Sequence, residues 1–141
     1  MSDKVFLDSN IWIYAATGRV SALSKCEISC AIIAREKLAV SPQVIGEFYI
    51  NARNIKKMKE PLTDQEALGW ITRMQLFPFV DTDRGIINEA LLIAQRWQTR
   101  YWDAAILASA ARFGATTLYT EDLSHGQLYG SVRVVNPFRP A

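Results

Sequence analysis

The feature that most constrains this sequence is a short apolar run near its start that ends in an aspartate. The run at residues 5–7 is followed by Asp8, and Asn10 comes two places later. An apolar run bounded by polar residues is typical of a buried strand in a parallel sheet. Such sheets bind ligands at the carboxyl ends of their strands, so Asp8 is predicted to stand at a ligand-binding edge. Alternatively, Asp8 and Asn10 could simply cap the helix that follows.

The composition is that of a globular domain. The 141 residues are 50% hydrophobic and 21% charged, which is enough to bury a core and too apolar for a disordered chain. A net charge of +2 is too small to indicate nucleic-acid binding by bulk charge. The sequence has no apolar run long enough for a membrane span and no signal peptide, and Cys26 and Cys30 are expected to be reduced, partly buried core residues. We therefore expect a cytoplasmic protein.

Short apolar segments alternate with helical patterns along the chain. Strands are predicted at 5–7, 38–41, 116–119 and 132–135. Helices are predicted at 10–16, 21–35, 42 to about 55, 64–74, 84–98 and 101–113, with a break at 17–19 and a loop at 121–130. Such alternation is typical of an α/β fold. We expect a single domain over residues 1–141, an α/β/α sandwich around a central, mostly parallel, short-stranded sheet.

Four of the fourteen acidic residues lie beside apolar segments, where a buried charge is costly unless it serves a function. Asp8 ends the first strand and Asp122 follows the strand at 116–119, so both are expected at one sheet edge. Glu47 borders the apolar stripe of its helix, and Asp103 lies in the first turn of the most apolar helix. Each has an ordinary alternative, such as a helix cap, a surface ion pair or a turn. Together they predict an acidic pocket, because like charges gathered in one place need a counter-ion.

The residue types favour a hard divalent cation. Oxygen ligands without nearby histidine or cysteine suit Mg²⁺ or Mn²⁺ better than zinc, and Asn10 and Thr120 can add neutral oxygens. Such a site suits phosphodiester hydrolysis by a metal-activated water. A phosphotransferase of the haloacid-dehalogenase type also begins with a strand-end aspartate, but it needs a second aspartate two places later. Asn10 occupies that place and cannot transfer the proton.

At these residues the sequence resembles the PIN-domain ribonucleases, specifically the VapC-type toxins of VapBC toxin–antitoxin pairs. The resemblance runs the length of the chain. It rests on V-F-L-D-S-N at the start, S-P-Q-V-I-G-E-F-Y around Glu47, Y-W-D-A-A-I-L-A-S-A-A around Asp103, and L-Y-T-E-D-L-S-H-G-Q around Asp122. Ser9 stands where threonine is common and preserves the hydroxyl. Glu121 beside Asp122 is a second candidate acid, and the T-x-D spacing from Thr120 favours Asp122.

The resemblance implies a Mg²⁺- or Mn²⁺-dependent endoribonuclease that acts as the toxin of a type II toxin–antitoxin pair. Its catalytic and metal-binding acids would be Asp8, Glu47, Asp103 and Asp122, with Asn10 and Thr120 in support. It also implies a homodimer, an RNA substrate and a VapB-like antitoxin that occupies the active groove. The alternative within the same fold is a catalytically inactive module that binds RNA or protein.

Several further residues have an open role. Arg53, Lys56, Lys57 and Lys59 could contact an RNA backbone or form a solvated helix face. His125 could act as a general acid or base, although a single loop histidine is more often a structural hydrogen-bonding residue. The aromatic residues could stack on bases, line an interface or pack in the core; these are Trp12, Tyr14, Trp97 and Trp102.

Overall fold

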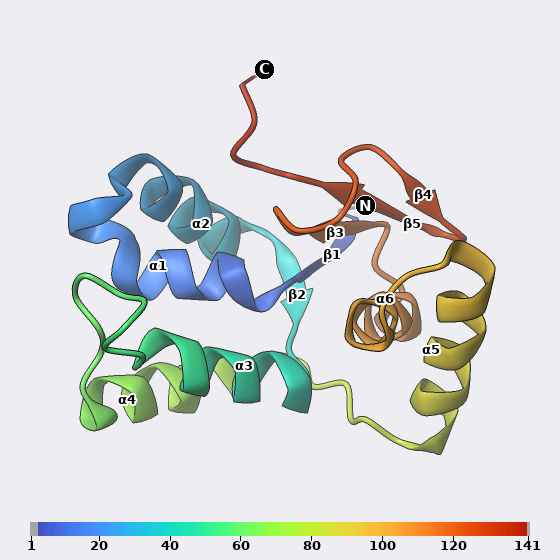
Figure 1. Cartoon of the computed structure of the whole chain (residues 1–141), viewed down its shortest axis with the longest axis horizontal. Helices are drawn as coiled ribbons and strands as arrows, with labels where there is room; N and C mark the ends of the chain where they lie inside the picture. Colours follow the sequence, from blue (N-terminus) through green and yellow to red (C-terminus); the bar gives the residue numbers. More distant parts are fainter. Residues whose placement is uncertain (1–2, 141) are drawn as a thin grey trace.

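A mixed β-sheet forms the centre of the fold in a computed structural model that describes residues 3–140 (Figure 1). Within this range its strands are β1 (Lys4–Leu7), β2 (Lys37–Ala39), β3 (Thr117–Tyr119), β4 (Leu128–Tyr129) and β5 (Val132–Val135). The strand order is β2-β1-β3-β5-β4. All neighbours run parallel except β4, which pairs antiparallel with β5 at the sheet edge.

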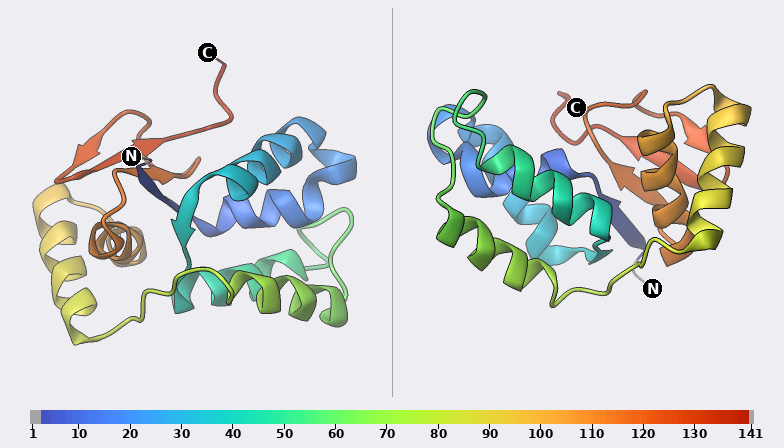
Figure 2. Two further views of the ribbon diagram at one scale, coloured as in Figure 1. Left: turned by 180° about the vertical axis from the view of Figure 1, so that it is seen from behind. Right: turned by 60° about the horizontal axis from the view of Figure 1, so that its bottom comes forward.

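Helices cover both sides of this sheet. They are α1 (Ser9–Ser21), α2 (Leu23–Arg35), α3 (Pro42–Ala52), α4 (Asp64–Met74), α5 (Arg84–Trp97) and α6 (Tyr101–Phe113). Figures 1 and 2 show α1–α4 on one side of β1, and α5 and α6 on the other. Helix α6 packs on β1, β3 and β5, which explains why it is buried almost all round. The α/β/α sandwich expected from the sequence is therefore confirmed.

Residues whose types favour helix ends cap several of these helices. The Ser41 hydroxyl accepts a hydrogen bond from the Val44 backbone N–H at 3.4 Å, and Thr63 forms a reciprocal capping box with Glu66. Asp83 caps α5, and Gly114 ends α6 in the left-handed conformation with φ of 84°. Local sequence chemistry thus sets where these helices begin and end.

The first helix is longer than predicted. The expected break at 17–19 is wrong, because α1 continues through Gly18 to Ser21. A Cβ at Gly18 would lie 3.1 Å from the Cβ of Cys26, so the glycine permits close packing of α1 on α2. Cys26 is buried there, but Cys30 is exposed, which corrects the expectation that both are core residues.

The predicted loop at 121–130 contains a strand. Residues 128–129 form β4, which pairs with β5 through Leu128–Arg133 and Tyr129–Val132. Two residues are too short for an alternation pattern to be visible in the sequence. Within residues 3–140, every helix is too short or too polar to span a bilayer.

Candidate active site

The ends of β1 and β3 bring Asp8 and Thr120 side by side. The parallel register pairs Leu7 with Tyr119, and the Asp8 backbone N–H donates to the Tyr119 carbonyl at 3.0 Å. The Thr120 hydroxyl donates to Asp8 Oδ2 at 2.8 Å, and the Ser9 backbone N–H donates to Asp8 Oδ1 at 2.7 Å. Asp8 is 8% exposed. It therefore caps α1, as the alternative reading allowed, while it also stands at the predicted sheet edge.

Asn10 ties the loop after β3 to the first turn of α1. Its Nδ2 donates to Asp122 Oδ2 at 3.0 Å and to the Thr120 hydroxyl oxygen at 3.3 Å. The same hydroxyl oxygen accepts from the Asp122 backbone N–H at 3.1 Å. Asn10 and Thr120 therefore link Asp8 and Asp122 in one hydrogen-bonded group. The amide nitrogen of Asn10 therefore contacts Thr120 and Asp122.

The two acids on helices, Glu47 and Asp103, line the same cavity as Asp8 and Asp122. A cavity of about 280 Å³, here called the acidic cavity, lies between the strand ends, α3 and α6. Its lining consists of Asp8, Ser9, Gln43, Glu47, Arg100, Trp102, Asp103, Ile106 and Asp122. All four acids singled out in the sequence therefore line one cavity, although they come from four separate chain segments. Gln43 Nε2 donates to the Trp102 carbonyl at 3.0 Å and so connects α3 with α6 beside it.

Three polar residues of the lining were not predicted from the sequence as part of the site. Ser9 adjoins Asp8, and Gln43 lies one helical turn before Glu47, so their spacing was a usable signal. Arg100 contacts Asp103, with Nε 3.4 Å from Oδ2, at the N-terminus of α6. Its position three residues before Asp103 is a weaker signal, because an exposed arginine has many possible partners.

Burial makes the charge of Asp8 costly. Desolvation raises the pKa of Asp8 from 3.8 to about 6, despite the hydrogen bonds from Thr120 and Ser9, which lower it. The neighbouring charges of Glu47 and Asp122 raise the pKa of Asp8 further. The cavity therefore opposes the ionised form of its central acid.

The surroundings of Glu47 also disfavour its ionised form. Burial raises the pKa of the Glu47 carboxyl, while hydrogen bonds with Gln43 and Ser9 lower it. The charges of Asp103 and Asp122 then add to the increase in the pKa of Glu47. A bound cation would relieve the repulsion around both carboxyls, as expected where like charges share a pocket.

The donor set fits a hard divalent cation in its chemistry. Carboxylate oxygens surround the cavity, and the buried Asn10 Oδ1 accepts no hydrogen bond from residues 3–140. In the same range, no three acidic, histidine or cysteine side chains already converge as a metal-binding cluster. Side chains of the acidic cavity would therefore have to rotate toward one another to close around an ion.

Glu121 has different hydrogen-bond partners from Asp122. The Tyr14 hydroxyl donates to Glu121 Oε1 at 2.6 Å, and Lys25 Nζ donates to Glu121 Oε2 at 3.0 Å. Lys25 Nζ also lies 4.7 Å from the ring centroid of Tyr14 and 5.3 Å from that of Phe138. Glu121 does not line the acidic cavity. It instead anchors the loop that carries Asp122 to α1 and α2.

We expect Lys25 and Glu121 to be energetically coupled. Their side chains are 38% and 24% exposed, so solvent weakens the ion pair, and the shared Tyr14 contact strengthens it. A double-mutant cycle of Lys25→Met and Glu121→Gln should give a coupling of about 1 kcal/mol in urea unfolding. The matched exposed pair Arg35–Glu36 should give a smaller value. Equal couplings in the two cycles would contradict the anchoring role of Glu121.

The other candidate residues separate by their contacts. Arg53 is engaged in the fold, because its guanidinium pairs with Asp64 at 2.7 Å and lies over the Tyr49 ring. Lys56 and Lys57 are exposed. His125 Nδ1 accepts a hydrogen bond from a loop backbone N–H at 2.9 Å, which agrees with a structural role.

The four aromatic candidates differ in their burial and contacts. Trp12 is buried in the core, where it makes an edge contact with Phe77. Trp97 is half-buried against Tyr129. Trp102 is 61% exposed and lines the acidic cavity, so it is the tryptophan placed to meet a ligand there.

A sequence profile of the PIN domain family matches residues 5–130. A search of the curated proteins found no match. Among solved structures, a toxin–antitoxin complex from Klebsiella pneumoniae matches at 19% identity with a TM-score of 0.69, covering 97% of this chain and all of that one.

Two further solved structures share the fold at similar distance. Mycobacterium tuberculosis VapC20, a sarcin–ricin loop cleaving toxin, matches at 14% identity with a TM-score of 0.65, over 84% of this chain and 90% of that one. Rickettsia felis VapBC2, bound to a DNA fragment from its promoter, matches at 16% identity with a TM-score of 0.63, over 92% and 96%. At these identities the similarity establishes a shared fold.

Proposed function

The chain belongs to the PIN domain family, and from this premise we propose that it is a metal-dependent endoribonuclease, the toxin of a type II toxin–antitoxin pair. The observation that carries the proposal is the gathering of Asp8, Glu47, Asp103 and Asp122 around one cavity of about 280 Å³. Four carboxyls from separate segments are costly to place together unless they serve a bound cation. Solved structures of the same fold include a sarcin–ricin loop cleaving toxin, which makes RNA the substrate class to test.

The four acids would hold Mg²⁺ or Mn²⁺, and they are proposed as the catalytic set. A bound ion of this kind activates water for attack on a phosphodiester and stabilises the charge that develops on the phosphate. Asp8, fixed by Thr120 and Ser9, would provide the most rigid carboxylate. Asn10 would hold Asp122 in place through its Nδ2 contact. Trp102, exposed at the cavity, would meet an unstacked base.

Protein partners form the second half of the proposal. A toxin of this kind would form a homodimer in the cytoplasm and bind a VapB-like antitoxin. Solved structures of the same fold include a toxin–antitoxin complex. Exposed apolar side chains on or beside α4 and α5 give such partners a surface to cover; among them are Leu68, Leu76, Leu91 and Leu92.

The direct test is RNA cleavage by the purified chain. End-labelled single-stranded and hairpin RNAs should be cut internally with Mg²⁺ or Mn²⁺ and left intact with EDTA. Products should carry a 5′-phosphate and a 3′-hydroxyl, which ligation of the fragments would detect. Binding of RNA without cleavage in the presence of either ion would contradict the proposed ribonuclease activity and favour the inactive binding module.

A further inference from the structure

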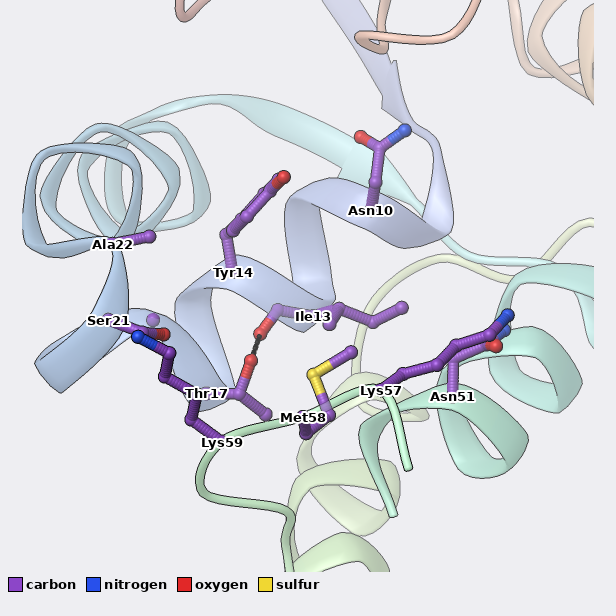
Figure 3. Close-up of a pocket in the computed structure, with 11 residues that line it drawn as sticks. Asn10, Ile13, Tyr14, Thr17, Ser21, Ala22, Asn51, Lys57, Met58 and Lys59 are labelled. Carbon is purple, nitrogen blue, oxygen red and sulfur yellow. Dashed lines mark hydrogen bonds between the residues drawn. The ribbon is translucent and has the colours of Figure 1, made fainter. Parts of the chain in front are cut away.

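A second cavity lies beside the acidic cavity and has the opposite character. It occupies about 450 Å³ between α1 and the segment that connects α3 with α4 (Figure 3). Its lining is Asn10, Ile13, Tyr14, Thr17, Gly18, Ser21, Ala22, Asn51, Lys57, Met58 and Lys59. Because two lysines and no acid line it, we call it the lysine cavity.

A hydrogen bond from Asn10 links the linings of the two cavities. Asn10 lines the lysine cavity, and its Nδ2 contacts Asp122, which lines the acidic cavity. From Asn10 the lysine cavity follows one face of α1 through Tyr14 and Thr17 to Ser21. The eleven helical steps from Asn10 to Ser21 span about 16 Å, which accommodates a few nucleotides of an extended strand. A strand leaving the acidic cavity past Asn10 would therefore enter the lysine cavity.

The two lysines are available for a ligand. Neither Lys57 nor Lys59 makes an ion pair with another residue of the range 3–140. Arg53 at the start of the same segment is by contrast paired with Asp64. Two free cations beside a cavity without acids favour an anionic occupant.

The segment that carries the lysines is held in a fixed turn. Leu62 donates its backbone N–H to the Ala52 carbonyl at 2.9 Å, which closes the segment at its base. Asn54 Oδ1 accepts from the Lys56 backbone N–H at 2.9 Å and from that of Lys57 at 3.3 Å. Binding here would thus order the lysine side chains and leave the backbone in place.

The lysine cavity also has apolar lining residues. Ile13 and half-buried Met58 provide it, together with the ring of Tyr14. The Tyr14 ring is held by its hydroxyl bond to Glu121 and by an edge contact with Phe138. The Thr17 hydroxyl is engaged with the Ile13 carbonyl, as the dashed line in Figure 3 shows. A fixed aromatic ring with flanking cations is the combination that binds bases and phosphates of single strands.

We propose that the lysine cavity binds the single-stranded RNA that flanks the scissile phosphate. Lys57 and Lys59 contact its phosphates, and Ile13, Tyr14 and Met58 contact a base or ribose. This inference rests on the proposed ribonuclease function and adds the path of the substrate. RNA is favoured over an acidic peptide because Asn10, which lines this cavity, contacts Asp122 of the acidic cavity, where a phosphodiester would be cut.

The test measures RNA binding separately from cutting. A fluorescently labelled single-stranded RNA is titrated in EDTA, and its anisotropy gives the dissociation constant at several salt concentrations. Lys57→Ala combined with Lys59→Ala should weaken binding about tenfold and reduce the slope of log affinity against log salt by about 1.4. Lys37→Ala combined with Arg84→Ala is the matched control, because both residues are exposed and neither lines the lysine cavity or the acidic cavity.

The outcomes distinguish this inference from the proposed function. Wild-type protein that cuts RNA, with binding unchanged in the double variant, would overturn the lysine cavity as a subsite and leave the ribonuclease intact. Equal losses in the Lys37→Ala, Arg84→Ala control would show diffuse attraction and also overturn it. A double variant that binds RNA normally but loses binding of labelled polyglutamate would assign the cavity to an acidic protein. Failure of wild-type protein to bind or cut RNA would instead refute the function itself.

Discussion

Asp8→Asn is expected to abolish RNA cleavage, by about 10³-fold or more, while the fold remains intact. Asp8 is the most buried acid of the acidic cavity and is bonded to Thr120, the centre of its hydrogen-bonded group. Asparagine has nearly the same shape and can still accept from Thr120, but it lacks the charge that a divalent cation needs. Initial cleavage rates of wild type and variant at saturating Mg²⁺ give the measurement.

The stability of the same variant provides an independent readout. Burial raises the pKa of Asp8 to about 6, so at pH 7.5 without metal the ionised side chain destabilises the fold. The neutral amide removes that cost but can accept only one of the two hydrogen bonds from Thr120 and Ser9, so the melting temperature should change little. Asp81→Asn, the same change at an exposed position outside the acidic cavity, should alter neither property. Rapid cutting by Asp8→Asn would contradict the assigned site, and unfolding of the variant would contradict the electrostatic argument.

The parts of the site that follow from parallel strands could be predicted from the sequence. Asp8 and the Thr120–Asp122 segment each follow a short apolar run, and parallel strands present their carboxyl ends at one edge. Their adjacency therefore needs no knowledge of the register beyond the two strand ends. Glu47 and Asp103 were harder, because a helix face fixes only the side on which a residue lies. It is the packing of α3 and α6 near the strand ends that places both acids at the acidic cavity.

Features that depend on packing between distant segments could not be predicted. Thr17 and Gly18 disfavour helix locally, yet α1 continues because close contact with α2 outweighs that preference. The contacts of Glu121 join residues from α1, α2 and the loop after β3, and neither charge nor spacing shows that they meet. Arg53 similarly finds Asp64 across the segment between α3 and α4. Side-chain partners of this kind require the tertiary structure.

We also expect the stability of the metal-free protein to fall as the pH rises, and divalent cations to reverse this dependence. Asp8 has a pKa of 3.8 when unfolded and about 6 when folded, so the folded state binds its proton more tightly. Without metal, this stabilisation is complete below pH 3.8 and is lost as the pH rises through about 6. The difference of roughly two pKa units corresponds to at most about 3 kcal/mol, and the raised pKa of Glu47 acts in the same direction.

Urea unfolding in EDTA at pH 5 and pH 7.5 measures the upper part of this loss, about 1.4 kcal/mol, and Asp8→Asn should flatten it. Mg²⁺ should stabilise the fold more at pH 7.5 than at pH 5, because ligand binding requires the ionised carboxylates. The proton and the cation then compete for one group, so the metal-induced stabilisation should grow over the same range in which the metal-free protein loses stability. Stability of the wild type that is independent of pH in EDTA would contradict the buried charge at Asp8. Mg²⁺ stabilisation that persists unchanged in Asp8→Asn would place the cation elsewhere.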